Sequence, residues 1–333
     1  MNPSEQAQLG KSSVRLPRFG LGTAPLGNLF AVVEEQEADA TIERALELGM
    51  RYVDTAPQYG FGIAEQRVGR VLGNHPRDSY MLSTKVGRLL RADAPPDPRG
   101  FRDGVPYYRE TPPVNLRYDY SADGVRRSFE ESLQRLGLDR VDIVLIHDAD
   151  DFYRQALDEA FPALAQMRSE GTIGAVGAGM NQAEMLADFA RNADFDCFLV
   201  AGRYTLLDQA ALADLMPLCV QKNIGVIIGG VYNSGILANP RPGSTFNYDP
   251  AAQHWLERAQ RLEAVCQRHD VPLKAAALQF PLAHPAVTTV LTGARSVAEL
   301  DENGKMFRHE IPASLWSELR AEGLLPEEAP LPA

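Results

Sequence analysis

Residues 128–148 read SFEESLQRLGLDRVDIVLIHD and join one helix to one strand. In the first half, Phe129, Leu133 and Leu136 recur at the spacing of a single helical face. The second half, residues 141–146, is almost continuously aliphatic, which is typical of a strand covered on both faces. An amphipathic helix that leads directly into a buried strand predicts an α/β fold with a parallel sheet.

The same alternation continues on both sides of this stretch. The expected strands are residues 20–24, 52–55, 80–85, 141–147, 173–177, 197–201, 225–228 and 287–291. The expected helices are residues 35–48, 121–136, 156–168, 182–191, 210–222, 254–268 and 297–306. Eight strands that alternate with helices favour a closed (β/α)8 TIM barrel over an open doubly wound sheet. An N-terminal hairpin would precede the barrel, and residues 272–282 and 312–322 would form extra C-terminal helices.

The composition bounds the remaining choices. A chain of 333 residues without a Gly/Ser linker fits one barrel domain over residues 1–333. Its formal net charge of −11 disfavours binding to nucleic acid or to anionic lipids. No run approaches the roughly 18 apolar residues of a membrane span, and the N-terminus lacks an apolar signal core. We therefore expect a cytoplasmic protein in which Cys197, Cys219 and Cys266 are buried, unpaired thiols.

Two long irregular segments, residues 88–120 and 239–252, each follow an expected strand. On a barrel both would lie at the C-terminal rim, where enzymes of this architecture keep their sites. Long loops in compact domains are usually functional. Their aromatic residues would either wall a substrate pocket or pack the loops down; these are Phe101, Tyr107, Tyr108 and Trp255.

Four polar residues lie at or just beyond the ends of expected strands. Asp54, Lys85 and His147 each end an apolar run, and Tyr59 follows Asp54 by five residues. Barrel closure would bring them around one mouth. A nearby ammonium lowers the pKa of a tyrosine from about 10, toward the range in which it exchanges protons at neutral pH. Asp54 would hold Lys85 and a neutral His147 would orient a substrate oxygen, although each residue alone could be purely structural.

Four segments resemble the aldo-keto reductase family in the order in which that family carries them. They are GLGTAPLG (20–27), YVDTAPQYGFGIAEQRVGRVL (52–72), STKVG (83–87) and the opening stretch, 128–148. The resemblance extends from about residue 19 to residue 303. It implies a (β/α)8 barrel, a nicotinamide cofactor and a catalytic tetrad, which here is Asp54, Tyr59, Lys85 and His147.

The resemblance also implies where the cofactor binds. The nicotinamide would lie near Met180 and Asn181, although Met180 departs from the usual Gly-x-Ser-Asn pattern. The family commonly places a glutamine and a stacking aromatic residue beside the nicotinamide ring. The corresponding residues here are Ala201 and Gly229, so the ring must be bound differently, or Tyr232 or Tyr204 would substitute. The segment NSGIL (233–237) resembles the pyrophosphate loop, where small residues let backbone amides approach phosphate. Further expected contacts are Gly22, Thr23, Asp54, Ser234, Gly235 and Leu237.

The last strand and helix address the choice between NAD and NADP. In NADP-specific relatives this stretch carries a lysine and an arginine, and the matching positions here are Gly293 and Glu299. A carboxylate repels a 2′-phosphate but accepts hydrogen bonds from a ribose diol, which favours NAD. Arg295 could reach a 2′-phosphate, so NADP is the alternative. Glu302 and Asn303 are expected to contact the adenine. No group of His, Asp and Glu has metal-ligand spacing, so no metal is expected.

Residues 118–124 and the sequence HDADD (147–151) resemble one branch of the family, that of the D-threo-aldose (L-fucose) 1-dehydrogenases, L-galactose dehydrogenases and pyridoxal 4-dehydrogenases. The expected reaction is oxidation of the anomeric hydroxyl of an aldose to a lactone, with hydride transfer to NAD. The alternatives are a pyridoxal 4-dehydrogenase, an NADPH-dependent aldehyde or ketone reductase, and a non-catalytic regulatory barrel that binds cofactor. The expected partner is a small sugar or carbonyl substrate, bound by a monomer or a homodimer.

Overall fold

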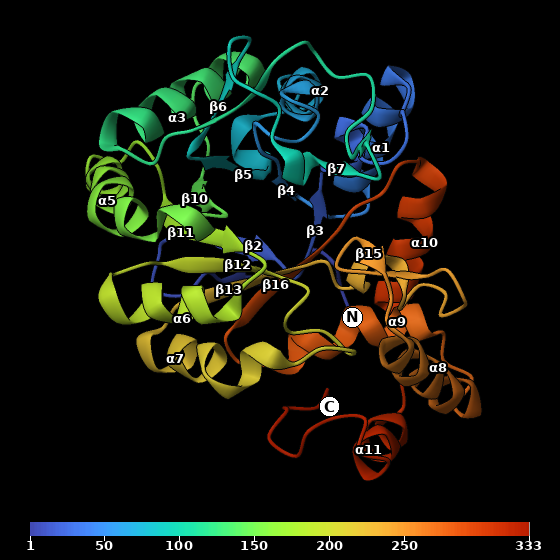
Figure 1. The fold of residues 1–333 in the computed structure, drawn as a ribbon. Coiled ribbons are helices and arrows are strands. Elements are labelled where there is room, and N and C mark those ends of the chain that lie inside the picture. Colours follow the sequence, from blue (N-terminus) through green and yellow to red (C-terminus); the bar gives the residue numbers. More distant parts are fainter. Residues whose placement is uncertain (333) are drawn as a thin grey trace.

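Eight parallel strands close into a barrel in the computed structural model, which describes residues 1–332 (Figure 1). Each strand pairs with the next in the chain, and the last returns to the first with Val290 opposite Phe19. This confirms the expected eight strands, with small shifts at their ends. They are β3 (Phe19–Gly22), β4 (Tyr52–Asp54), β5 (Met81–Val86), β10 (Ile143–His147), β11 (Ala175–Met180), β12 (Cys197–Ala201), β13 (Gly225–Gly229) and β16 (Val287–Thr292).

Helices surround this barrel, as Figure 1 shows. Those that follow the strands are α1 (Glu35–Glu47), α2 (Ile63–Leu72), α3 (Ala122–Leu136), α5 (Phe161–Ser169), α6 (Ala183–Asn192), α7 (Leu215–Lys222), α9 (Leu273–Gln279) and α10 (Val297–Arg308). A short helix, α4 (Tyr153–Gln155), and a π-helical segment, Ala156–Ala160, lead into α5. The expected helices omitted α2, although Ala64, Val68, Val71 and Leu72 carry its periodic signal and are all buried.

One expectation about the extra helices is wrong. Residues 272–282 were expected to be an addition to the barrel, but α9 within them packs directly against α10 as a barrel helix. The additions are α8 (Gln253–Arg268), which packs on α9, and α11 (Ala313–Ala321), which packs on α8. Periodicity misleads here because α9 is short and buried on nearly every side, whereas α8 has the amphipathic pattern of a surface helix.

The expected N-terminal hairpin is present and lies at the N-terminal end of the barrel. Strands β1 (Gln6–Gln8) and β2 (Arg15–Pro17) pair antiparallel. Leu9, Val14 and Leu16 of this hairpin join a buried cluster with side chains inside the barrel. The tip packs so closely that a Cβ added to Gly10 would lie 2.4 Å from the backbone of Gly225. One end of the barrel is thus filled, which leaves the opposite end for a functional site.

The two long segments at that opposite end contain more regular structure than expected. Residues 88–120 include β6 (Arg88–Arg91) paired with β9 (Asn115–Tyr118), and a small hairpin of β7 (Phe101–Arg102) and β8 (Val105–Pro106). Residues 239–252 include the pair β14 (Thr245–Phe246) and β15 (Asp249–Pro250). They follow the C-terminal ends of β5 and β13, as expected, so the interpretation of both as irregular is wrong but their position is confirmed.

Two other expectations concern cysteines and membranes. Cys197, Cys219 and Cys266 are buried free thiols, which confirms the prediction from their apolar settings. Across residues 1–332, none of the helices combines the length and apolar character that crossing a bilayer requires.

Candidate active site

Three neighbouring strands carry the predicted tetrad at their C-terminal ends. Asp54 is the last residue of β4, Lys85 is the next-to-last residue of β5, and His147 is the last residue of β10. Tyr59 lies in the turn after β4. This turn packs against a backbone that needs glycine, since a Cβ added to Gly27 would lie 2.5 Å from the carbonyl carbon of Tyr59. The register of the barrel and this close packing therefore bring the four residues together.

Lys85 has three protons on its ammonium group and three acceptors around it. Its Nζ donates to Oδ2 of Asp54 at 2.6 Å, to the carbonyl oxygen of Thr55 at 3.0 Å and to the hydroxyl oxygen of Tyr59 at 3.0 Å. Asp54 also accepts a hydrogen bond at Oδ1 from the Ser83 hydroxyl, 2.7 Å away. The Lys85 and Asp54 side chains are only 2% and 4% exposed. This network fixes the ammonium against the phenol.

The expected lowering of the Tyr59 pKa is wrong for the structure described here. Burial raises the pKa of Tyr59 well above 10, and the carboxylate of Asp54 raises it further. The physical reason is that burial disfavours the charged phenolate and that the Asp54 carboxylate, which pairs with Lys85, repels it. Tyr59 is therefore a protonated phenol at neutral pH, held by a hydrogen bond from Lys85.

His147 is neutral at neutral pH, as the sequence led us to expect. Burial lowers its pKa well below 6.5, and the positive charges of Arg88 and Lys85 lower it further. Its ring stands edge-on to the ring of Tyr59, with centroids 6.0 Å apart. Within residues 1–332 its buried Nδ1 has no hydrogen-bond partner. A neutral imidazole beside a phenol can orient an oxygen atom of a substrate without adding charge.

A buried ion pair beside His147 was missed by the sequence reasoning. Arg88 donates from Nη2 to Oδ2 of Asp148 at 2.9 Å, and that oxygen lies 3.6 Å from Nε2 of His147. The hydroxyl of Tyr120 donates to the carbonyl oxygens of both His147 and Asp148. The available signal was an acidic residue directly after the His147 strand and an arginine two residues after the end of the Lys85 strand.

Aromatic rings from three loops meet over this end of the barrel. Tyr108 lies 6.5 Å from the ring of Tyr59. Phe30 stands edge-on to Tyr107 at 5.6 Å, and Tyr248 lies 6.1 Å from Phe30 and 6.3 Å from Tyr107. Two of the four expected aromatic residues, Tyr107 and Tyr108, are thus placed beside the tetrad, while Phe30 and Tyr248 were not foreseen.

The other two expected aromatic residues are not beside the tetrad rings. Trp255 stacks on Phe246 with centroids 4.4 Å apart, so it packs the loop that follows β13. Phe101 is an exposed residue of the β7–β8 hairpin. Trp255 therefore fits the packing alternative, whereas the exposed Phe101 fits neither alternative.

The expected nicotinamide-side residues occupy the ends of β3 and β11. Gly22 pairs in register with Asp54, and Thr23 donates from its hydroxyl to the Asp54 carbonyl oxygen at 2.9 Å. Met180 is the buried last residue of β11, and Asn181 follows it half-buried.

Ala201 and Gly229 stand where the family commonly has a glutamine and a stacking aromatic residue. They lie opposite each other in the register of β12 and β13. Tyr232 donates from its hydroxyl to Oδ1 of Asn303 at 3.0 Å and so reaches the β16–α10 region. Tyr204 instead packs between Phe280 and His284, away from the tetrad.

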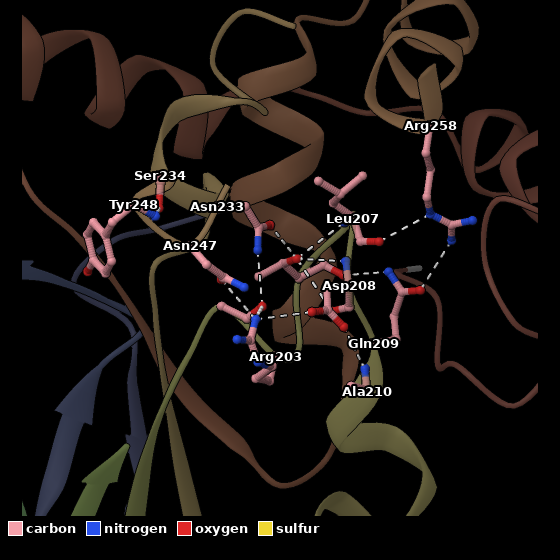
Figure 2. A network of polar contacts seen from close by, with 12 residues as sticks. Arg203, Leu207, Asp208, Gln209, Ala210, Asn233, Ser234, Asn247, Tyr248 and Arg258 are labelled. Carbon is pink, nitrogen blue, oxygen red and sulfur yellow. Dashed lines mark hydrogen bonds and ion pairs between the residues drawn. The ribbon is translucent and has the colours of Figure 1, made fainter. Parts of the chain in front are cut away.

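The segment NSGIL (233–237) is anchored by a polar network (Figure 2). Asn233 donates from Nδ2 to the Gly202 carbonyl oxygen at 3.0 Å, and Ser234 accepts at Oγ from the Tyr248 amide at 3.0 Å. Arg203 joins Asn247 at 3.0 Å and Asp208 at 3.3 Å. Residues 233–235 all have positive φ, which turns their backbone sharply. Leu237 is fully buried below this turn.

The residues expected at the adenosine end lie between β16 and α10. Glu299 accepts at Oε2 from the backbone amide of Arg295 at 2.9 Å, and its other oxygen lies 3.5 Å from the guanidinium of Arg295. Glu302 pairs with Lys274 at 2.8 Å. Asn303 bonds to Tyr232 and lies 3.5 Å from the Gly293 carbonyl oxygen. All five expected positions are therefore close in space.

A family model for the aldo/keto reductase family matches residues 18–322 of this sequence. The chain belongs to the aldo-keto reductase family. This aldo-keto reductase is 40% identical to a D-threo-aldose 1-dehydrogenase from Pseudomonas sp, over 97% of this chain and 99% of the relative. It is also 40% identical to a pyridoxal 4-dehydrogenase from Microbacterium luteolum, over 98% and 99% of the two chains. An L-galactose dehydrogenase from Arabidopsis thaliana is 30% identical, over 91% and 88%.

Solved structures agree with the barrel of this aldo-keto reductase. An aldo-keto reductase from Bacillus halodurans in its holo form superposes with a TM-score of 0.74, 24% identity and coverage of 98% and 99% of the two chains. A glycerol dehydrogenase from Gluconobacter oxydans superposes with a TM-score of 0.73, 21% identity and coverage of 99% of both chains. The family and the 40% identity to two dehydrogenases establish an NAD(P)-dependent oxidoreductase.

Several features at the strand ends of this aldo-keto reductase fit a nicotinamide dinucleotide. The buried hydroxyl of Thr292 and Nδ1 of His147 lack hydrogen-bond partners among residues 1–332. At Gly22 and Gly235 an added Cβ would meet no atom closer than 3.9 Å, so ligand atoms could approach the backbone there. Unpaired polar atoms and an open backbone at one end of a barrel are what a large polar cofactor requires.

Proposed function

We propose that this aldo-keto reductase oxidises the anomeric hydroxyl of an aldose to a lactone, with NAD as hydride acceptor. The observation that carries the proposal is the hydrogen bond of 3.0 Å between Lys85 Nζ and the Tyr59 hydroxyl, beside a neutral His147. The 40% identity to a D-threo-aldose 1-dehydrogenase, over nearly the full length of both chains, supports the substrate class. A pyridoxal 4-dehydrogenase activity is the second candidate, because that relative is equally similar.

The proposed chemistry assigns one task to each residue of the tetrad. Bound NAD supplies the electrophilic carbon that accepts the hydride from C1 of the sugar. His147, as a neutral imidazole, orients the hydroxyl oxygen on C1. Tyr59 exchanges the hydroxyl proton, and Lys85 holds the phenol oxygen in place from 3.0 Å. Asp54 neutralises Lys85, so the buried ammonium does not remain unpaired.

The direction of the Tyr59 pKa shift has a consequence for this assignment. Because burial raises the pKa of Tyr59, its phenol stays protonated and can supply a proton in reduction, but it accepts one only after deprotonation. Oxidation of the sugar should therefore accelerate as the pH rises and the phenolate population grows. This is the behaviour of an enzyme whose proton acceptor is a high-pKa phenol.

Charges around Arg295 support the preference for NAD. Arg295 is engaged by Glu299, and it borders an open cavity of about 420 Å³ that is also lined by Glu34 and Glu37. The carboxylates of Glu34, Glu37 and Glu299 give this region a negative potential that repels an additional dianionic phosphate. Where NADP-specific relatives carry a lysine and an arginine, this chain has Gly293 and Glu299. Neither residue can bind phosphate as a cation does.

A substrate screen tests the proposed function. Purified protein is offered NAD or NADP with L-fucose, L-galactose, D-arabinose or pyridoxal, and reduced cofactor is followed by absorbance. We expect turnover of at least one aldose with NAD. Failure with every aldose, together with NADPH-dependent reduction of aldehydes, would refute the proposal.

Tyr59→Phe tests the role of the phenol in the same assay. We expect turnover to fall at least a hundredfold with cofactor binding retained, because the loss removes only the proton-exchanging group. Tyr153→Phe is the matched control, since Tyr153 lies on α4, where it stacks on Phe189.

A further inference from the structure

Asp148 is a carboxylate that the tetrad chemistry does not use, although it lies beside the reacting groups. It follows His147 directly, and its Oδ2 lies 3.6 Å from Nε2 of that histidine. Its side chain is 23% exposed, and Arg88 binds only Oδ2. None of residues 1–332 donates a hydrogen bond to Oδ1. One carboxylate oxygen is thus fixed and neutralised, while the other is left to accept a hydrogen bond.

Three tyrosine residues indicate that Asp148 lies on the same side of the molecule as the tetrad. Burial is the main cause that raises the pKa of Tyr59, Tyr108 and Tyr248, and the Asp148 carboxylate contributes to the rise in all three. The charge of the carboxylate therefore acts on the phenol groups at and over the tetrad. Its backbone has φ +36°, a conformation that aspartate and asparagine tolerate better than most residues.

Arg88 is the buried partner of a carboxylate that stays partly exposed. Arg88 is only 6% exposed, and its guanidinium contributes nothing to the Lys85 network. Because the Asp148 side chain is 23% exposed and its Oδ1 is not a buried atom, a hydroxyl group of a substrate can reach that oxygen from solvent and donate to it.

We propose that Asp148 is a specificity-determining residue, which accepts a hydrogen bond from the substrate hydroxyl on the carbon next to the reacting carbon. His147 orients the reacting oxygen, and the Asp148 carboxylate lies 3.6 Å from Nε2 of that histidine, which places it beside the neighbouring oxygen of the same substrate. Arg88 fixes one oxygen of the carboxylate through its hydrogen bond to Oδ2. This proposal rests on the proposed function, because an aldose provides the adjacent hydroxyl.

A substrate pair tests the proposal directly. The aldose that the wild-type protein turns over best is compared with its 2-deoxy analogue, and kcat/KM is measured for both with NAD. The variant is Asp148→Asn, which keeps the shape and the backbone preference but removes the charged acceptor. Asp151→Asn is the matched control, because Asp151 is an exposed residue that pairs with Arg99 on the surface. Thermal unfolding of each variant shows whether it is folded.

We expect Asp148→Asn to reduce kcat/KM for the aldose by about tenfold to a hundredfold, the usual effect of a lost hydrogen bond to a charged group. The 2-deoxy analogue should change less than threefold, so the preference for the hydroxylated substrate falls. Asp148→Glu should also lose the preference, since it retains the charge for Arg88 but displaces the acceptor. Equal losses on both substrates, or no loss on either, would overturn the proposal, because the residue would then act through His147 or not at all.

Failure of the proposed function is distinguishable from failure of this inference. If the wild-type protein oxidises no aldose, the same variants are compared in the reduction of glyceraldehyde and of propanal, which differ by hydroxyl groups that include the one adjacent to the carbonyl. A reduced preference for glyceraldehyde in Asp148→Asn supports the role of Asp148 without the aldose assignment. An unchanged preference overturns it in that direction as well.

Discussion

The Lys85–Asp54 pair allows a quantitative test of how the site is stabilised. Lys85→Met removes the ammonium and leaves the Asp54 carboxylate, which is 4% exposed, without its charged partner. Breaking a buried ion pair from one side costs about 3–5 kcal/mol. With an unfolding entropy of about 2.1 cal/mol/K per residue, a chain of 333 residues should lose roughly 4–7 °C in Tm.

The double variant Asp54→Asn with Lys85→Met separates the charge from the packing. It removes both members of the pair, so no buried charge stays uncompensated, and we expect it to regain at least half of the lost Tm. Neither variant should be active, because the Tyr59 hydroxyl has lost its hydrogen bond from Nζ in both. Thermal unfolding followed by circular dichroism at pH 7 measures the three proteins. If the double variant is no more stable than Lys85→Met, the electrostatic explanation is refuted.

Three further predictions follow from the same geometry. Because burial raises the pKa of Tyr59 well above 10, log kcat/KM for oxidation should rise by about one per pH unit from pH 7 to 9.5, and a plateau below pH 9 would contradict the shift. Because burial lowers the pKa of His147 in the folded protein, the unfolded chain binds more protons than the folded one below about pH 6.5. Between pH 7 and pH 5 the free energy of unfolding should therefore fall for wild type by about 2 kcal/mol more than for His147→Gln, measured by denaturant unfolding. Arg203→Ala removes the bond to Asn247, and limited proteolysis within residues 239–252 should accelerate several-fold while other sites are unchanged. Unaltered cleavage would mean that other contacts hold this segment.

Residue patterns within single segments accounted for much of this fold. The aliphatic run 141–146 and its counterparts identified all eight strands, because strands covered on both faces leave a continuous apolar signal. Helix α2 was missed and α8 was taken for a barrel helix, since periodicity reports that a helix has an apolar face but not what that face contacts. Segments 88–120 and 239–252 appeared irregular because their strands are only two to four residues long.

The candidate site divides in a similar way. Asp54, Tyr59, Lys85 and His147 were found because each lies at or just after the end of a recognisable strand, and parallel strands end at one mouth. Arg88, Asp148 and Tyr248 were not found, because their pairing with one another and with the tetrad depends on contacts between segments that are distant in the chain. The direction of the Tyr59 pKa shift was also mistaken, since its sign depends on burial and on the partner of Lys85.

The sequence by itself determined the alternation of strands and helices, the parallel barrel and the set of four polar residues at its mouth, because these depend on local periodicity and chain order. Only the tertiary structure decided that burial raises the pKa of Tyr59, that Arg88 pairs with Asp148 beside His147, and that one oxygen of Asp148 has no donor among residues 1–332. The physical reason is that a charge acts through its distance to other charges and its exclusion from water. Both quantities are fixed only when segments far apart in the chain are packed together.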